Sequence, residues 1–308
     1  MMDITRLLED MSTTELRLAI QVQTKMISLI REFLLREKFV ELLPVIISPI
    51  TDPLTDFRLR GEVECYGYKY QITKSMIFHK QAALKAFPKI FCFSPNVRIE
   101  PAERQNSGRH LIEFVQLDLE VREATREDIL GLGERLFSYV IEGIRREAEE
   151  ELALLGRKLP EFRPPFERIT YEEAVREFGP DFELKLSAAR QEPVWLLDFP
   201  LEVREFYDRE YDNRPGVLVD MDLIYPEGYG EALSGGEREY QVERIQERIR
   251  KKGIDPEAYA IYLKLAERGL YPSCGFGFGI ERLTRFVCGL KDIGRTRLFA
   301  KKPAQFSL

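Results

Sequence analysis

Side chains that could bind phosphate and a divalent metal ion are spread over four separate stretches of this 308-residue chain. They are Arg98, Glu100, Arg109, His110, Asp222, Glu231, Ser234, Arg238 and Arg282. Guanidinium groups bind phosphate oxygens through planar, multidentate hydrogen bonds, and carboxylates with a hydroxyl are hard oxygen ligands that suit Mg²⁺. The Walker-A phosphate-binding motif is absent. The set therefore predicts an ATP site without a covalent nucleophile, in which catalysis comes from positioning and charge neutralisation.

A glycine-rich stretch at residues 274–283 supplies the last of these arginines. Gly275, Gly277 and Gly279 alternate with other residues, so an extended strand would place all three on one face and let a flat ligand approach. Arg282 would then lie in the first turn of a helix, where the helix dipole disfavours a cation. This placement indicates an external anion. Glycines that serve only tight packing, with Arg282 on the surface, explain this stretch alone equally well.

Two strands over residues 90–100 and 112–121, joined by a polar loop over 101–108, are predicted to form an antiparallel hairpin. Strand alternation places Phe114, Gln116, Asp118 and Glu120 on one face of the second strand. Such a face, beside a loop that carries Arg109, is suited to a polar, zwitterionic ligand. The alternative is an ordinary solvated sheet face.

The first predicted helix, over residues 14–38, follows a capping-box pattern at residues 12–15 and leads into a strand over 39–50 that contains Pro44 and Pro49. Such a helix and edge strand suit a symmetric contact between two copies, although an ordinary first helix and strand explain them equally well. Further helices are predicted over residues 74–86, 126–155, 239–252, 256–268 and 280–289, and further strands over 66–73, 193–199 and 217–225.

The composition of the chain limits the possible partners and the cellular location of the protein. The formal net charge is −6, so no global basic field draws in nucleic acid. The four cysteines, Cys65, Cys92, Cys274 and Cys288, show no paired spacing, which favours free thiols in a reducing cytoplasm over a zinc site. The chain shows no secretory signal and no long apolar run, so a cytoplasmic protein without a membrane partner is expected.

Three stretches resemble the motifs of class II aminoacyl-tRNA synthetases. Residues 98–100 with 109–114 are similar to motif 2, residues 275–282 to motif 3, and residues 231–238 to the intervening segment of the aspartyl/asparaginyl subclass. The resemblance extends from about residue 14 over nearly the whole chain. It implies an α+β fold, with a mostly antiparallel β-sheet flanked by helices, in one catalytic domain over residues 1–308.

The resemblance also implies roles for individual residues. Arg98 and Arg282 would be the catalytic residues. The nucleotide-binding set would be Arg98, Glu100, Arg109, His110, Phe114, Gly279 and Arg282. The amino-acid substrate would contact Ser75, Lys80, Gln116, Asp118, Glu237 and Arg238. Asp222, Glu231 and Ser234 would bind Mg²⁺. Two copies would pair as a homodimer through the motif 1 helix and strand, which are the predicted helix over residues 14–38 and the strand over 39–50.

The motif 1 helix starts close to the N-terminus, so an anticodon-binding domain is not expected. In this respect the chain resembles archaeal asparagine synthetases related to asparaginyl-tRNA synthetase. The predicted function is therefore ammonia-dependent asparagine synthesis: aspartate and ATP form a β-aspartyl adenylate, and ammonia releases asparagine and AMP, pyrophosphate having left in the first step. Binding of tRNA is not expected. Arg238 would hold the α-carboxylate, while Glu237, Asp52 or Asp56 would hold ammonium or accept its proton.

Two alternatives remain open at this level. One is an aspartyl- or asparaginyl-type transferase that acts on tRNA or on a protein. The other is a non-catalytic regulator derived from a synthetase, against which the presence of Arg98 and Arg282 counts. The sequence leaves open which carboxylate is activated and which group accepts the activated acid.

Overall fold

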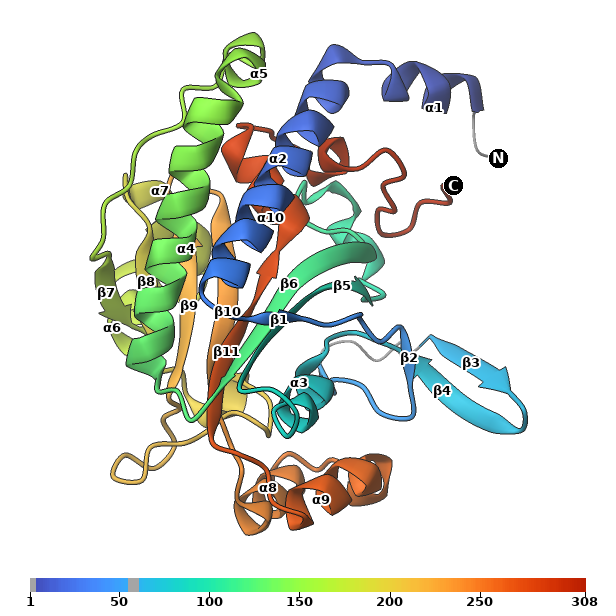
Figure 1. The fold of residues 1–308 in the computed structure, drawn as a ribbon, viewed down its shortest axis with the longest axis vertical. Helices are drawn as coiled ribbons and strands as arrows, with labels where there is room; N and C mark the ends of the chain where they lie inside the picture. The colour runs from blue at the N-terminus through green and yellow to red at the C-terminus, as the bar shows by residue number, and fades with distance from the viewer. Residues whose placement is uncertain (1–3, 55–60) are drawn as a thin grey trace.

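The computed structural model describes residues 4–54 and 61–308, and an eight-stranded sheet forms its centre (Figure 1). The strands lie in the order β1 (Val40–Glu41), β5 (Lys89–Val97), β6 (Glu113–Arg122), β11 (Ser273–Gly279), β10 (Gly230–Arg238), β9 (Asp220–Tyr225), β8 (Val194–Leu197) and β7 (Glu167–Thr170). Only the outer pairs, β1 with β5 and β7 with β8, are parallel. The prediction of an α+β fold with a mostly antiparallel sheet flanked by helices is confirmed.

A second, three-stranded sheet projects from the side of the molecule (Figure 1). It consists of β2 (Ile47–Ser48), β4 (Tyr68–Ile72) and β3 (Glu62–Cys65). The predicted single strand over residues 39–50 is thus wrong, because it divides into β1 and β2. Pro44 lies in the break between them, where a residue without an N–H group cannot extend a strand ladder.

Three helices, α2 (Thr14–Arg36), α4 (Arg126–Glu147) and α10 (Ile280–Val287), contribute to the largest apolar core, on one face of the main sheet. Helix α4 begins with a capping box in which Thr125 and Asp128 bond each other's backbone N–H groups. Helix α2 starts where predicted, but its N-cap Thr13 makes no side-chain capping bond. The predicted helix over residues 126–155 continues after α4 as the separate α5 (Glu149–Leu154), and α1 (Ile4–Met11) was not predicted.

Smaller helices complete the two other apolar clusters. Helices α3 (Ile77–Ala83), α8 (Val242–Lys251) and α9 (Ala260–Glu267) share one cluster, and α6 (Tyr171–Phe178) and α7 (Phe182–Ala189) pack against β7–β9 in the other. Short 3₁₀ turns are η1 (Ala102–Asn106), η2 (Leu201–Val203), η3 (Pro256–Tyr259) and η4 (Ile293–Thr296). None of the helices in the described ranges is both long and apolar enough to cross a membrane.

Strands β6 and β11 separate the apolar core from a polar face. Leu117, Leu119, Phe276 and Phe278 are buried in the core beneath the helices. On the opposite face, the glycines of β11 lie directly across from the polar residues of β6, in the pairs Gly275–Glu120, Gly277–Asp118 and Gly279–Gln116. The predicted alternation in both strands is confirmed, and each glycine leaves room for one polar side chain.

Candidate active site

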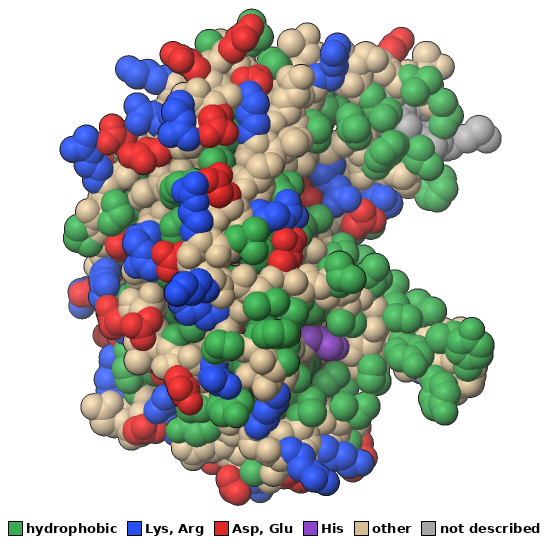
Figure 2. Space-filling model, in the orientation of Figure 1, with side chains coloured by type: hydrophobic (Ala, Val, Ile, Leu, Met, Phe, Trp, Pro, Cys, Tyr) green, Lys and Arg blue, Asp and Glu red, His purple; other side chains and the backbone are tan. Residues whose placement is uncertain are grey.

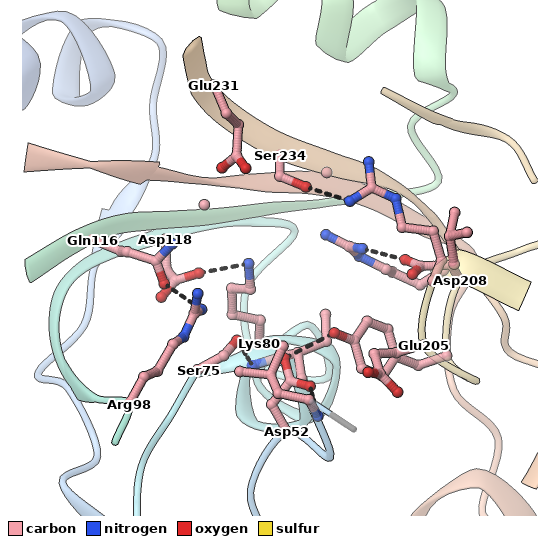
Figure 3. A pocket seen from close by; sticks show the side chains of 18 of the residues that line it. Asp52, Ser75, Lys80, Arg98, Gln116, Asp118, Glu205, Asp208, Glu231 and Ser234 are labelled. Carbon is pink, nitrogen blue, oxygen red and sulfur yellow. Dashed lines mark hydrogen bonds and ion pairs between the residues drawn. The ribbon is translucent and has the colours of Figure 1, made fainter. Parts of the chain in front are cut away.

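A cavity of about 520 Å³ opens on this polar face (Figure 3). Residues from strands β6, β10 and β11, from helix α3 and from the loop after β8 line it. Those with polar groups include Asp52, Ser75, Lys80, Arg98, Gln116, Asp118, Arg204, Glu205, Tyr207, Asp208, Glu231, Ser234 and Arg238. The sequence places these residues up to 186 positions apart (Asp52 to Arg238), so only the folded sheet brings them together.

One wall of the cavity is a buried ion pair between α3 and β6. Lys80 Nζ donates to Asp118 Oδ1 at 2.9 Å and lies 3.6 Å from Glu120 Oε2. Asp118 Oδ2 is also buried but has no hydrogen-bond partner among the described residues. A buried carboxylate oxygen without a partner is costly. It is therefore well suited to accept a hydrogen bond from a cationic ligand group such as an ammonium.

Arg238, at the end of β10, forms the base of the cavity. Its guanidinium donates to Asp208 Oδ1 at 2.8 Å, to Glu120 Oε1 at 3.3 Å and to the Gly275 carbonyl oxygen at 3.0 Å. The residue is 5% exposed. These partners hold it rigidly, and three of its five N–H groups are committed to them, which leaves two that could bind a ligand.

A second, smaller cavity of about 80 Å³ adjoins the first. It is lined by Arg98, Glu100, Arg109, His110, Leu111, Phe114, Gln116, Glu231, Gly279, Glu281, Arg282 and Ile293. This set contains every residue predicted to bind the nucleotide. Arg98, Gln116 and Glu231 line both cavities, so the two cavities share one wall.

Arg98 is held at this shared wall by neutral partners. Its Nε donates to the Lys74 carbonyl oxygen at 3.3 Å, and one Nη donates to Gln116 Oε1 at 3.4 Å. The guanidinium carbon lies 5.1 Å from the centre of the Phe114 ring. Because these contacts neutralise none of its charge, Arg98 is suited to meet an anion where the cavities join.

The remaining groups of the smaller cavity are paired with protein side chains. Arg282 forms an ion pair with Glu231 at 3.0 Å, and Arg109 forms a short one with Glu183 of α7. Burial, together with the charge of Arg282, lowers the pKa of His110 to about 4. The imidazole is therefore neutral at pH 7 and lies near Ser107 Oγ, at 2.7 Å.

The predicted Mg²⁺ ligands do not fit together as one three-ligand site. Asp222 Oδ1 accepts from Arg204 at 2.6 Å, and Ser234 Oγ accepts from the same guanidinium at 3.2 Å. Glu231 is paired with Arg282 instead. Within residues 4–54 and 61–308, no group of three or more His, Cys, Asp or Glu side chains is placed to hold a metal ion.

Of the residues predicted to hold ammonium, Asp52 lines the larger cavity and Glu237 does not. The structure places Glu237 outside the larger cavity, where its carboxylate accepts from the Arg126 backbone N–H at 3.0 Å and from Arg209 at 3.1 Å. Strand alternation explains this, since Glu237 and Arg238 point to opposite faces of β10. Asp52 does line the cavity and accepts from the Tyr207 hydroxyl at 2.8 Å. Asp56 lies outside the described residues.

Sequence reasoning missed several site residues that carry charge. Arg204, Asp208 and Glu183 each pair with a predicted residue: Asp222, Arg238 and Arg109, respectively. Arg204 and Asp208 lie in the loop between β8 and β9, which has no periodic pattern, and Glu183 lies on a short surface helix. One signal in the sequence could have indicated Arg204. Asp220 and Asp222 are two residues apart in the apolar strand β9, and carboxylates buried in this way require a cation nearby.

Comparisons with known proteins give a consistent result. Residues 3–303 match the family described as tRNA synthetases class II (D, K and N). The curated asparagine–tRNA ligase of Pyrococcus abyssi is 30% identical over 92% of this chain and 68% of its own length. That of Symbiobacterium thermophilum is 34% identical over 75% of this chain and 57% of its own. The chain thus spans 57–68% of these two curated relatives.

A solved structure shows the same likeness in three dimensions. The crystal structure of asparaginyl-tRNA synthetase from Pyrococcus horikoshii, complexed with asparaginyl-adenylate, aligns with a TM-score of 0.86 at 27% identity. The alignment covers 96% of this chain and 70% of that one.

These findings overturn two predictions. The predicted ammonia-dependent asparagine synthetase is wrong, because the relatives are named asparagine–tRNA ligases. Ammonia as a substrate and the expectation that tRNA does not bind are wrong for the same reason. The prediction gave too much weight to the early start of the motif 1 helix, which says nothing about the chemistry of the cavity.

Proposed function

Since the chain belongs to the class II tRNA synthetases (D, K and N), we propose that it activates asparagine with ATP and transfers the asparaginyl group to tRNA. The intermediate would be asparaginyl adenylate. The observation that carries the proposal is the wall shared by the two cavities, in which Arg98, Gln116 and Glu231 face both.

The larger cavity suits an amino acid. Its ammonium group would bind Asp118 Oδ2, the buried oxygen that has no partner among the described residues. With the ammonium group there, the carboxylate can reach Arg98 at the shared wall. Arg98 would bring this carboxylate and the α-phosphate together and offset their negative charges. A carboxylate oxygen then attacks the α-phosphorus, and pyrophosphate leaves.

The charge around Arg238 favours a neutral side chain. Glu120 and Asp208 already pair with this guanidinium, and both are buried. An aspartate side chain would add a third carboxylate in a place of low dielectric, which is unfavourable. The carbonyl oxygen of an asparagine amide can accept one of the remaining N–H groups of Arg238 without adding charge. We therefore assign asparagine rather than aspartate as the substrate.

The smaller cavity suits the nucleotide. Phe114 offers an aromatic face for the base, and Arg109 and Arg282 offer guanidinium groups for phosphate oxygens. Both arginines are paired with carboxylates, Glu183 and Glu231, so the triphosphate would have to replace these partners. ATP would bring a Mg²⁺ ion with it. In our proposal this ion binds beside Glu231 and not beside Asp222, because Arg204 already forms an ion pair with Asp222.

A pair of identical chains is also part of the proposal. Leu43 is 92% exposed and Ile46 is 58% exposed in the segment between β1 and β2. Figure 2 shows hydrophobic side chains gathered beside it over the β3–β4 hairpin, where Tyr66 and Tyr68 are exposed. This segment follows α2 and β1 in the chain, within the region of the predicted subunit contact. A two-fold contact would cover the same apolar surface on both copies.

The decisive experiment is ATP–pyrophosphate exchange with asparagine or aspartate as the only amino acid, followed by transfer of labelled asparagine to tRNA. We expect exchange with asparagine to exceed exchange with aspartate by about 10⁴-fold, the scale on which a site that hydrogen-bonds its substrate rejects an analogue that cannot make the bond. Equal or faster exchange with aspartate would refute the substrate assignment. Exchange without transfer to any tRNA would refute the second step.

A further inference from the structure

One arginine lies where the sequence motif predicts a metal ion. Arg204 follows the turn η2 and spreads its guanidinium over three oxygens of β9 and β10. Its Nε donates to Asp220 Oδ2 at 2.9 Å, one Nη to Asp222 Oδ1 at 2.6 Å and the other Nη to Ser234 Oγ at 3.2 Å. The bond at Ser234 is drawn in Figure 3. Two of the three predicted metal ligands therefore share this cation.

The guanidinium is held in place from several sides. Its carbon lies 3.7 Å from the centre of the Phe199 ring, and the Phe199 N–H donates to Asp220 Oδ1 at 3.0 Å. Asp220 and Asp222 are 1% and 6% exposed. A planar guanidinium that bonds two buried carboxylates and lies against an aromatic ring keeps little freedom to move.

A metal ion and this guanidinium exclude each other at Asp222 and Ser234. Magnesium binds oxygen at about 2.0–2.1 Å. An ion that bridged Asp222 Oδ1 and Ser234 Oγ would therefore meet the Arg204 nitrogens that already contact both atoms. Like charges so close together in a buried place repel strongly. The guanidinium also keeps its proton at any physiological pH, so the positive charge there does not depend on metal concentration.

We propose that Arg204 is the resident cation of this cluster, and that it replaces a divalent metal ion at Asp222 and Ser234. Metal binding in the site is then confined to the side of Glu231. This inference rests on the proposed ATP site. The number of metal ions bound without nucleotide, however, does not depend on which amino acid or acceptor the enzyme uses.

The test counts bound Mn²⁺ by the electron paramagnetic resonance of the free ion, with the whole 308-residue chain and no nucleotide. The wild-type protein and D222N are expected to bind the same number of Mn²⁺ ions, because Asp222 holds no metal ion in the wild type. The variant R204M keeps the length of the side chain and its packing on Phe199 but lacks the charge. It is expected to gain one Mn²⁺ per chain and to be stabilised by Mn²⁺ in thermal unfolding, and R204M/D222N is expected to lose this ion again.

Two results would overturn the proposal. One is a wild-type Mn²⁺ site, with or without a non-hydrolysable ATP analogue, that D222N abolishes. The other is a folded R204M that gains no ion. If R204M does not fold, the comparison of wild type with D222N still decides, because an arginine in place of the metal predicts equal Mn²⁺ counts for the two proteins.

Discussion

Lys80 Nζ and Asp118 Oδ1 lie 2.9 Å apart, and the two side chains are 4% and 2% exposed. Helix α3 and strand β6 meet through this pair directly beside the shared wall of the two cavities. The same carboxylate that fixes Lys80 presents its other oxygen without a partner among the described residues. Asp118 thus contributes to the packing of α3 against the sheet and, in the proposed function, also binds the ammonium group of the substrate.

Replacing Asp118 with Asn should affect both properties. The variant leaves Lys80 with a weaker partner in a buried place, so the free energy of unfolding should fall by about 3 kcal/mol. The KM for asparagine should rise at least about tenfold, since the ammonium loses a charged partner. Urea unfolding and pyrophosphate exchange measure the two effects. The exposed pair Glu247–Lys251 provides the control, because E247Q should change stability by less than about 0.5 kcal/mol.

Removing Glu183 should improve ATP binding. In the structure this carboxylate pairs with Arg109, and it would compete with the phosphates for the guanidinium. E183Q should lower the KM for ATP by about three- to tenfold, and R109M should raise it. Exchange kinetics at saturating asparagine measure both. An R109M variant with unchanged KM for ATP would contradict the role of Arg109.

Two glycines of β11 should respond differently to alanine. A Cβ atom on Gly275 would lie 2.2 Å from the Leu119 carbonyl oxygen, whereas one on Gly277 would meet only side-chain atoms, Gln116 Nε2 at 3.1 Å and Asp118 Oδ1 at 3.4 Å. G275A should therefore lose about 3 kcal/mol of stability or fail to fold. G277A should fold and lose exchange activity, because the methyl group enters the cavity. Thermal unfolding distinguishes them, and equal stability of the two variants would show that the β6–β11 contact is less tight.

His110 should make stability depend on pH. Its folded-state pKa of about 4 lies below the ordinary value of 6.5, so the folded state favours the neutral ring. The resulting stability is complete above pH 6.5 and is lost as the pH falls towards 4. Wild type should therefore lose more stability than H110Q over this interval in urea unfolding. Parallel curves for the two proteins would show that His110 titrates normally.

The proposed pairing of two chains should depend on the exposed segment between β1 and β2. L43E/I46E introduces four like charges into a two-fold contact, because each copy contributes two. Sedimentation should therefore show wild type at twice the chain mass of 36.0 kDa and the variant at the single mass. K264E on α9, away from this segment, should stay paired. A monomeric wild type would refute the proposal.

The sequence predicted the strands of the site well, because alternating patterns are local. The opposite faces of β6, with Leu119 and Asp118 on different sides, and the glycine face of β11 follow from a period of two. The pairing of Arg109 with Glu183, or of Arg204 with Asp222, could not be predicted in this way. Each joins a strand or its loop to an irregular or distant segment, and only tertiary packing brings the two charges together.

The function was mispredicted for a different reason. Our proposal of asparagine as the substrate depends on the cavity, where Arg238 already has two carboxylate partners. The prediction of asparagine synthesis depended instead on where the chain begins. The charges around Arg238 could not be counted before the fold placed Asp208 and Glu120 beside it.

The one-to-one pairing of glycines and polar residues between β11 and β6 makes the core and the site depend on the same alignment of two strands. A slip of one residue would turn Phe276 and Phe278 towards the ligands and the glycines towards the helices. A single-residue deletion in β11 would therefore abolish folding and activity together.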